Sequence, residues 1–120
     1  MPQIPAHYRV LDKSRRRPRA GARIVGPADT NEIITTSVRV RRRPDAPALP
    51  DSSELAATPR GERQYISRED FAAHYGAAQE DLDKIAAFGR ENGLEVVESS
   101  TARRTVVLRG TAAQISKAFA

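Results

Sequence analysis

The stretch YISREDFAAHYGAAQEDLDKIAAFGRENGLEVVE (residues 65–98) decides the fold, because it holds the strongest apolar periodicity in the 120-residue chain. A main helix is predicted from about Ala78 to Asn92. Small and apolar residues recur there at the spacing of one buried helical stripe: Leu82, Ile85, Ala86 and Gly89. Gly93 is suited to end that helix in the left-handed conformation. A glycine on the buried stripe itself, Gly89, indicates that the helix lies close against a sheet.

Two shorter helices flank this element in the sequence. The first is predicted to begin after Ser67, which can cap it together with Asp70, and to be closed by Gly76 as a C′ glycine, the position that usually takes the left-handed conformation. The second is predicted to begin after Thr111, which can cap its first turn. The side chains of this last helix that should face inward are Ile115 and Phe119.

Three strands are predicted, at Glu32–Arg42, Leu94–Glu98 and Thr105–Arg109. The first is rich in β-branched residues and alternates between two faces, which is typical of a half-buried strand. Its core-facing residues are Ile34, Thr36, Val38 and Val40. The other two strands form a hairpin across a polar turn at 99–104. The order of strands and helices predicts an α+β, ferredoxin-like fold, with an antiparallel sheet and helices packed on one face.

The predicted order is one strand short of the complete ferredoxin-like unit, so the chain is expected to lack the last strand. In the strand order 4-1-3-2, this leaves Glu32–Arg42 as an unpaired edge, with Arg39 and Arg41–Arg43 as charged protection. Such an edge invites self-association or the addition of a strand from a partner. We therefore expect the isolated chain to be marginally stable or self-associating.

The domain organisation follows from composition. Residues 32–120 are predicted to form one domain, truncated at its C-terminal end, with a flexible loop at 44–63 that contains four prolines. Residues 1–31 form a basic segment rich in Pro, Gly and Arg, with too little apolar surface to fold by itself, and are predicted to be mobile.

Charge is distributed unevenly along the chain. Residues 1–43 hold eleven Arg and Lys against three Asp and Glu, a net charge of +8 within an overall +5. A basic front half of this kind suggests a polyanionic or acidic partner. There is no cysteine, which excludes disulfides and thiolate chemistry. No run approaches the roughly 20 apolar residues of a membrane span, and the N-terminus has no apolar core of a secretory signal.

With these residues in order, the chain resembles the activation prodomain of the sedolisin/kumamolisin family of serine-carboxyl peptidases. The lead-in and first strand ARIVGPADTNEIITTSVRVRRR (22–43) is similar to the family's G-x-x-D-x-x-E segment and the arginine run that follows it. SREDFAAHYGAAQEDLDKIAAFGRENGLEVVE (67–98) resembles its Phe-x-x-x-Tyr-Gly segment, main helix and second strand. RRTVVLRGTAAQISKAFA (103–120) resembles its third strand and last helix.

The resemblance implies a non-catalytic prodomain that acts as intramolecular chaperone and inhibitor of a peptidase domain, in cis or in trans. It also implies removal by proteolysis at acidic pH and an extracellular location. The family's catalytic Ser-Glu-Asp set and its calcium site belong to the peptidase domain, so no catalytic, cofactor-binding or metal-binding residue is expected in this chain. A zymogen function without enzymatic activity of its own is therefore predicted.

The sheet supplies the candidate site. If one face takes the helices, the other presents a mixed patch of valines and charges, which is suited to docking on a partner. The predicted partner-binding residues are Thr35, Ser37, Arg39, Glu95, Val97, Val107 and Arg109. We expect the arginines to lie opposite acidic groups of the peptidase. The alternative for the same valines is an ordinary solvent-exposed sheet face.

Interpretations of the chain as an enzyme, a metal-binding protein or a nucleic-acid-binding protein have less support in the sequence. His7 and His74 have no acidic or histidine partner at ligand spacing, and Ser67 and Thr111 are best explained as helix caps. The acidic residues Glu80, Asp81 and Asp83 complement the helix dipole rather than indicate a calcium site. The alternative function is a small basic nucleic-acid-binding protein that uses its arginine-rich front. The arginine runs lack interleaved aromatics and any base-reading motif, so we favour the peptidase partner.

Overall fold

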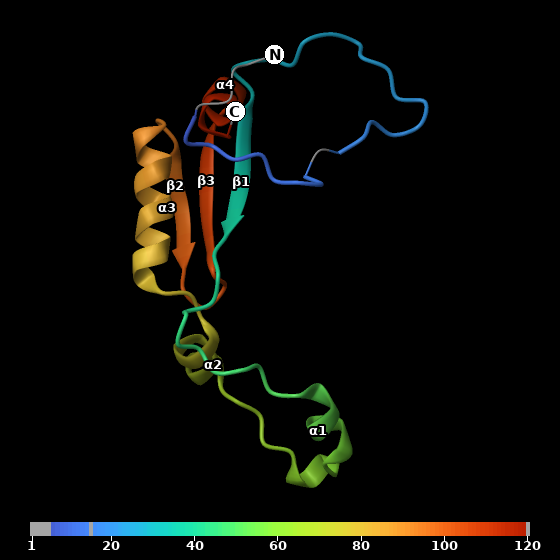
Figure 1. The fold of residues 1–120 in the computed structure, drawn as a ribbon, viewed down its shortest axis with the longest axis vertical. Coiled ribbons are helices and arrows are strands. Elements are labelled where there is room, and N and C mark those ends of the chain that lie inside the picture. The colour runs from blue at the N-terminus through green and yellow to red at the C-terminus, as the bar shows by residue number, and fades with distance from the viewer. Residues whose placement is uncertain (1–5, 15, 120) are drawn as a thin grey trace.

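The chain folds as a three-stranded antiparallel sheet with helices on one face, in a computed structural model that describes residues 6–14 and 16–119. This is an α+β arrangement, as predicted (Figure 1). The elements follow in the order β1 (Ile33–Arg39), α1 (Ser52–Ala57), a 3-10 turn (Arg60–Glu62), α2 (Arg68–Tyr75), α3 (Gln79–Glu91), β2 (Glu95–Ser100), β3 (Thr105–Thr111) and α4 (Ala112–Phe119).

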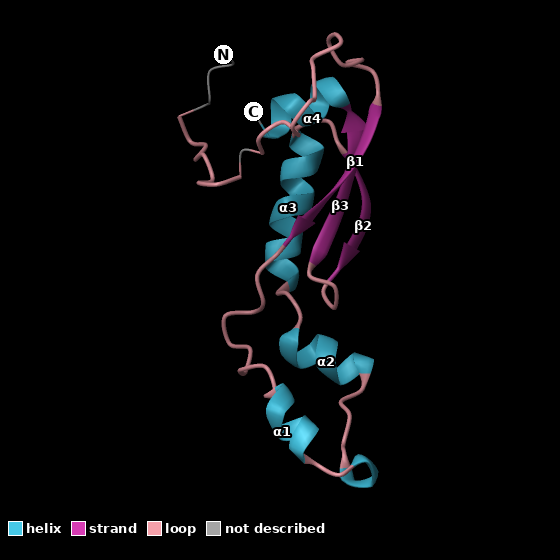
Figure 2. Cartoon of the chain, turned by 90° about the vertical axis from the view of Figure 1, so that its right-hand side faces the viewer, coloured by secondary structure: helices cyan, strands magenta, loops and turns pink. Residues whose placement is uncertain are grey.

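The strand order in the sheet is β1-β3-β2, with both pairs antiparallel. This is the order expected for the first three strands of a ferredoxin-like sheet, and it leaves β1 at one edge. The helices α3 and α4 lie on the same side of the sheet: α3 packs on β2 and β3, and α4 reaches β3 and β1 (Figure 2). The opposite face of the sheet, which we call the outer face, carries no helix in the described part of the chain.

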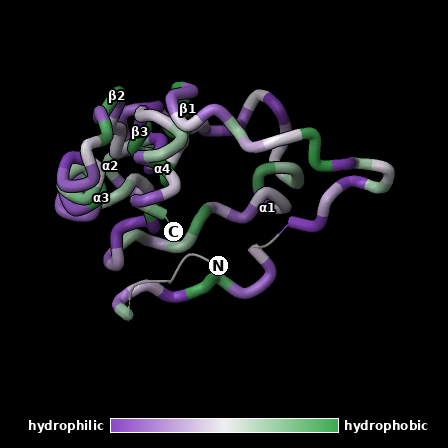
Figure 3. Tube along the Cα trace, turned by 90° about the horizontal axis from the view of Figure 1, so that it is seen from above, coloured by the Kyte–Doolittle hydropathy of each residue, from purple (hydrophilic) through white to green (hydrophobic). Residues whose placement is uncertain are grey.

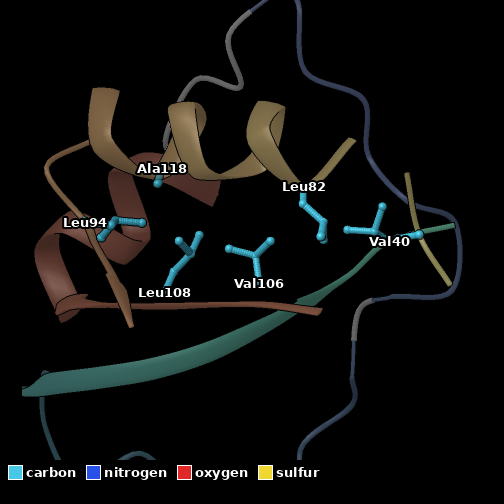
Figure 4. Close-up of a cluster of buried hydrophobic side chains, with 7 residues drawn as sticks. Val40, Leu82, Leu94, Val106, Leu108 and Ala118 are labelled. Atoms are coloured by element: carbon cyan, nitrogen blue, oxygen red, sulfur yellow. The ribbon is translucent and has the colours of Figure 1, made fainter. Parts of the chain in front are cut away.

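A small aliphatic core lies between the sheet and its helices (Figure 4). Val106 and Leu108 of β3 are fully buried, as is Leu82 at 1% exposure from the stripe of α3. The other stripe residues are buried or packed against this cluster, which confirms the helical periodicity. The prediction for α4 was partly wrong. Ile115 packs on the core, but Ala118 takes the fully buried position and Phe119 is 45% exposed, in edge contact with Phe88.

The contact between α3 and β3 depends on Gly89. A Cβ atom at this position would lie 2.7 Å from Cδ2 of Leu108, which is closer than carbon atoms can pack. The helix therefore approaches the sheet as the buried glycine predicted. Gly93 adopts φ +74° and ends α3. The Gly93 and Leu94 N–H groups donate to the carbonyls of Arg90 and Gly89, which is the Schellman pattern.

Side-chain caps begin the shorter helices where the sequence places them. The Ser67 hydroxyl accepts from the Asp70 N–H at 3.1 Å. At α4, Thr111 Oγ1 accepts from the Gln114 N–H, and Gln114 Oε1 accepts from the Thr111 N–H at 2.8 Å. This reciprocal pair is a complete capping box. Gly76 closes α2 with extended rather than left-handed backbone (φ −72°), so the expected glycine conformation was wrong there.

The segment after β1 is fixed to the start of α3 by an ion pair. Arg41 Nε donates to Asp81 Oδ2 at 2.8 Å, and the Asp81 side chain is only 14% exposed. Lys84 lies 3.8 Å from the other carboxylate oxygen. The hydrogen bond from Arg41 lowers the pKa of Asp81, and the charges of Arg41 and Lys84 act in the same direction against the cost of burial.

The remaining segments extend away from this unit, and the radius of gyration is 19.5 Å, against about 13–14 Å for a compact domain of this length. The arm with α1 and α2 lies beyond one end of the sheet (Figure 1). The helix α1 was not predicted, because residues 44–63 were interpreted as a flexible loop. Asp51 caps this α1 by accepting from the Ser53 N–H. Residues 6–32 contain no helix or strand in their described part, and short hydrophobic stretches lie there between mainly hydrophilic ones (Figure 3).

Two contacts join the arm to the sheet unit. The Arg43 N–H donates to the Gly76 carbonyl at 3.0 Å, and the Ala77 N–H donates to the Thr101 carbonyl at 2.9 Å. A Cβ atom on Gly76 would lie 2.3 Å from the Ala72 carbonyl oxygen and 2.8 Å from that of Thr101. Since both neighbours are backbone atoms, they cannot move independently of the fold. Gly76 is thus needed for space.

Replacing Gly76 with Ala should lower the free energy of unfolding by about 1–3 kcal/mol, because the new methyl group overpacks the junction against backbone. Gly61→Ala is the matched control, since nothing lies within 4 Å of a Cβ atom there. Denaturant titration followed by circular dichroism measures both variants. Equal stability of the two variants would contradict the junction as described.

Replacing Asp81 with Asn should lower the melting temperature at neutral pH and leave it nearly unchanged in strong acid. A carboxyl with a lowered pKa stabilises the folded chain above its unfolded value of about 3.9. This stabilisation is lost as the pH falls through the lower folded value. Glu80→Gln, in the same helical turn but without an arginine contact, is the control. Melting curves that differ equally for both variants at every pH would argue against the Arg41–Asp81 pair.

Candidate partner-binding face

The seven residues predicted to contact a partner lie together on the outer face of the sheet. Burial alternates along β1 and β2, so that the side chains of Thr35, Ser37 and Arg39 are exposed while their neighbours turn toward the helices. The outer-face residues of the other strands are Glu95, Val97, Val107 and Arg109, of which only Val107 is half-buried. The structure therefore brings the predicted set onto one surface, and its binding role remains a prediction.

The strand register arranges these residues in rows. Thr35 of β1 and Glu95 of β2 are the two partners of Arg109 on β3. Ser37 lies opposite Val107 in the next row, and Arg39 lies opposite Thr105 beyond it. The face thus runs from a charged row, through a row with a central valine, to an arginine at the end of β1.

An ion pair within the face was not anticipated. Arg109 donates to Oε2 of Glu95 from Nη2 at 2.7 Å and from Nε at 3.1 Å. Both side chains are about half exposed, so the net stabilisation is expected to be small. The opposite charges on paired hairpin strands would have suggested this contact from the sequence. Because Glu95 already neutralises Arg109, Arg39 is the arginine of the predicted set without a carboxylate within 4 Å in the described residues.

A β-bulge lies in the middle of the face. The pairing of β2 with β3 skips from Val96 opposite Leu108 to Glu98 opposite Val107, so Val97 is the extra residue. Val97 is 46% exposed, and Glu98 forms an ion pair with Arg103. The bulge adds a carboxylate next to the valines that were predicted to lie together. It could not be read from the strand pattern, which places Glu98 on the inner face.

An open hollow of about 500 Å³ lies where the face meets the start of α4. It is lined by the Glu95–Arg109 pair and by residues outside the predicted set: Ile33, Gly93, Gly110, Thr111 and Gln114. Ile33 is 61% exposed there. The glycine at 110 is required, because a Cβ atom would lie 2.5 Å from Cδ2 of Leu94. The hollow is large enough to hold a side chain.

Arginines gather at the opposite end of the sheet. Arg104, in the β2–β3 turn, adopts φ +52° and donates from Nη1 to the Val40 carbonyl at 3.2 Å. Desolvation lowers the pKa of Arg104, and the nearby charges of Arg42 and Arg39 lower it further. The sequence reasoning missed Arg104, because a turn residue gives no sign of which strand end it meets.

The remaining candidates have structural roles. Ser67 and Thr111 act as caps, and Nδ1 of His74 lies 2.7 Å from the Asp70 carbonyl oxygen of its own helix. Among residues 6–14 and 16–119, no group of three or more His, Cys, Asp or Glu could hold a metal ion. No helix in this described part is long and apolar enough to cross a membrane.

Comparison with known proteins shows which family the chain belongs to. The family described as "Pro-kumamolisin, activation domain" matches residues 20–120. A tripeptidyl-peptidase, sed5, of Aspergillus fumigatus is 30% identical over 110 residues, which are 92% of this chain and 19% of the relative. Kumamolisin of a Bacillus species is 30% identical over 94 residues, which are 78% of this chain and 17% of the relative. The chain thus spans about a fifth of the length of these curated relatives.

The match includes every strand and helix of the structure, and both relatives are sedolisin-type peptidases. The outer face, the main helix and the contact of Arg104 with Val40 all lie within the matched residues. The chain therefore belongs to the Pro-kumamolisin activation domain family, the propeptides of sedolisin peptidases.

Proposed function

We propose that this chain is a non-catalytic activation prodomain that binds a sedolisin-type peptidase domain through the outer face of its sheet. It acts on that domain as a folding chaperone and as an inhibitor, in cis or in trans, and is removed by proteolysis at acidic pH. The observation that carries the proposal is the family match over residues 20–120, which include the whole sheet and its outer face.

The composition of the face suits docking. Val97 and Val107 provide apolar area at its centre, with polar and charged side chains around them. Interfaces that form and separate again have this mixture of an apolar centre and a polar rim. The hollow beside Ile33 can receive a side chain, which gives the contact a fixed position along the sheet. The helices on the inner face hold the three strands in place, so that docking requires little rearrangement.

Electrostatics provide a route for acid release. Arg39 has no carboxylate partner within the described chain, and we infer that it pairs with an acidic group of the peptidase domain. Protonation of that group in acid removes the attraction and weakens the complex. Arg109 contributes less, because Glu95 accepts both of its hydrogen bonds.

The added chain should inhibit a purified sedolisin-type peptidase, and the inhibition constant should rise between neutral pH and about pH 4, where carboxylates begin to protonate. Arg39→Glu should raise the constant at neutral pH by at least about tenfold, since it replaces attraction with repulsion. Arg60→Glu, on the distant arm, is the control for net charge. Absence of inhibition by the folded chain would contradict the inhibitory role, and a constant insensitive to pH and to Arg39→Glu would contradict the electrostatic route.

We also propose that the free edge of β1 permits self-association. The Ala112 N–H donates to Glu32 and the Val40 N–H donates to Arg104, which shows that even-numbered residues of β1 bond to β3. The backbone groups of Ile33, Thr35, Ser37 and Arg39 therefore point to the open edge. An antiparallel second copy centred on Thr36 would satisfy these groups and keep the two Arg39 side chains at opposite ends.

The isolated chain should show a sedimentation coefficient that rises with concentration, because the unpaired backbone of β1 can add a strand. Thr35→Pro removes one edge-facing N–H and should abolish the rise, since proline cannot donate to a ladder. Circular dichroism checks that this variant remains folded. A monomer at all concentrations, with a sharp reversible melting transition, would show that the edge is stable when unpaired.

A further inference from the structure

Three arginines meet where β1 ends beside the β2–β3 turn. The Val40 N–H donates to the Arg104 carbonyl at 2.8 Å, and the Arg104 guanidinium donates back to the Val40 carbonyl. This reciprocal contact holds Arg104 at the end of β1, where the charges of Arg39 and Arg42 act on it. We call Arg39, Arg42 and Arg104 the arginine end of the sheet.

The arginine end has no counter-charge of its own. No carboxylate in the described chain lies within 4 Å of a charged nitrogen of these three residues, whereas other arginines nearby do have acidic partners. Asp81 bonds to Arg41, and Glu98 bonds to Arg103. Asp81 and Glu98 are therefore already neutralised by arginines outside the arginine end.

Burial makes this imbalance costly. Nε of Arg42 is buried and has no hydrogen-bond acceptor, and the same holds for Nε of Arg43. Loss of hydration and the neighbouring charges of Arg42 and Arg39 lower the pKa of Arg104. Guanidinium groups in this situation gain from an anion that accepts several hydrogen bonds at once. The folded chain thus holds positive charge at this place that its own side chains do not compensate.

We propose that the arginine end binds an acidic polypeptide segment, through carboxylates that bridge Arg39, Arg42 and Arg104. A polypeptide fits better than a nucleic acid for two reasons. The neighbouring arginines Arg41 and Arg103 are already neutralised by Asp81 and Glu98, so the unpaired positive charge is confined to three residues, whereas a nucleic-acid backbone requires a continuous basic track. No aromatic contact in the described structure includes any of the three arginines, so the site lacks the aromatic platform on which single-stranded nucleic acids stack their bases.

This site lies at the end of the proposed docking face and adds Arg42 and Arg104 to it. It rests on the folded chain alone and not on the proposed function, because an acidic segment can be bound without any peptidase present. If the peptidase domain is the partner, an acidic loop of that domain is the segment that the arginine end selects.

The test is a titration of the chain with a short glutamate-rich peptide, measured by calorimetry at moderate salt. The same peptide with glutamine in place of glutamate, and a single-stranded oligonucleotide of equal net charge, are the comparison probes. The glutamate peptide should bind, and its affinity should fall as salt is raised. Binding of the glutamine peptide with equal affinity, or tighter binding of the oligonucleotide, would overturn the proposal.

Variants locate the site. Arg42→Gln and Arg104→Gln should each weaken binding of the glutamate peptide by about tenfold, the effect of losing one charge-assisted contact. Arg39→Gln should weaken it similarly and is the safer variant, because Arg39 is exposed and outside the core. Arg60→Gln makes the same change in net charge on the distant arm and should leave the affinity unchanged. An equal loss in Arg60→Gln, or no loss in Arg39→Gln, would place binding elsewhere.

Discussion

The close packing of α3 on β3 is the contact on which the rest of the structure depends. Gly89 lets the helix come near enough for Leu82 to be enclosed together with Val106 and Leu108, and a methyl group at position 89 would push against Leu108. Each fully buried aliphatic side chain contributes about 1.5–3 kcal/mol, so a few such residues carry much of the stability of so small a core. With most apolar residues on one side, the other face of the sheet has to be polar or to meet a partner.

The strand β1 has less helix packed on it than the other strands, and polar contacts hold its end. It pairs only with β3, and the helix that reaches its inner face is the short α4 rather than α3. The Arg41–Asp81 pair and the reciprocal bonds between Val40 and Arg104 hold its last residues. The Arg41–Asp81 pair is lost when acid protonates Asp81, whereas the apolar core does not respond to pH. The strand that carries three of the seven candidate residues is thus also one whose attachment weakens in acid.

The main helix, the three strands and their faces could be predicted because each depends on local periodicity. The short α1 could not, since Leu55 is its one large apolar residue and no core lies beneath it, although Asp51 followed by two serines is a capping signal. The bulge at Val97 depends on how two strands align, which the alternation of one strand does not contain. Gly76 illustrates a different limit: a glycine can be required for space as well as for a left-handed turn.

The charges of the candidate site show why residue type alone was insufficient. Arg39 and Arg109 look equivalent in the sequence, since each stands on a strand with its side chain on the outer face. The fold places Glu95 beside Arg109 and no carboxylate beside Arg39, and it brings Arg104 from a distant turn to increase the local positive charge. An ion pair completed within the chain gives a partner little to gain, whereas an arginine without one retains most of its capacity to bind. Recognition by this surface should therefore depend on the end of β1 more than on its centre.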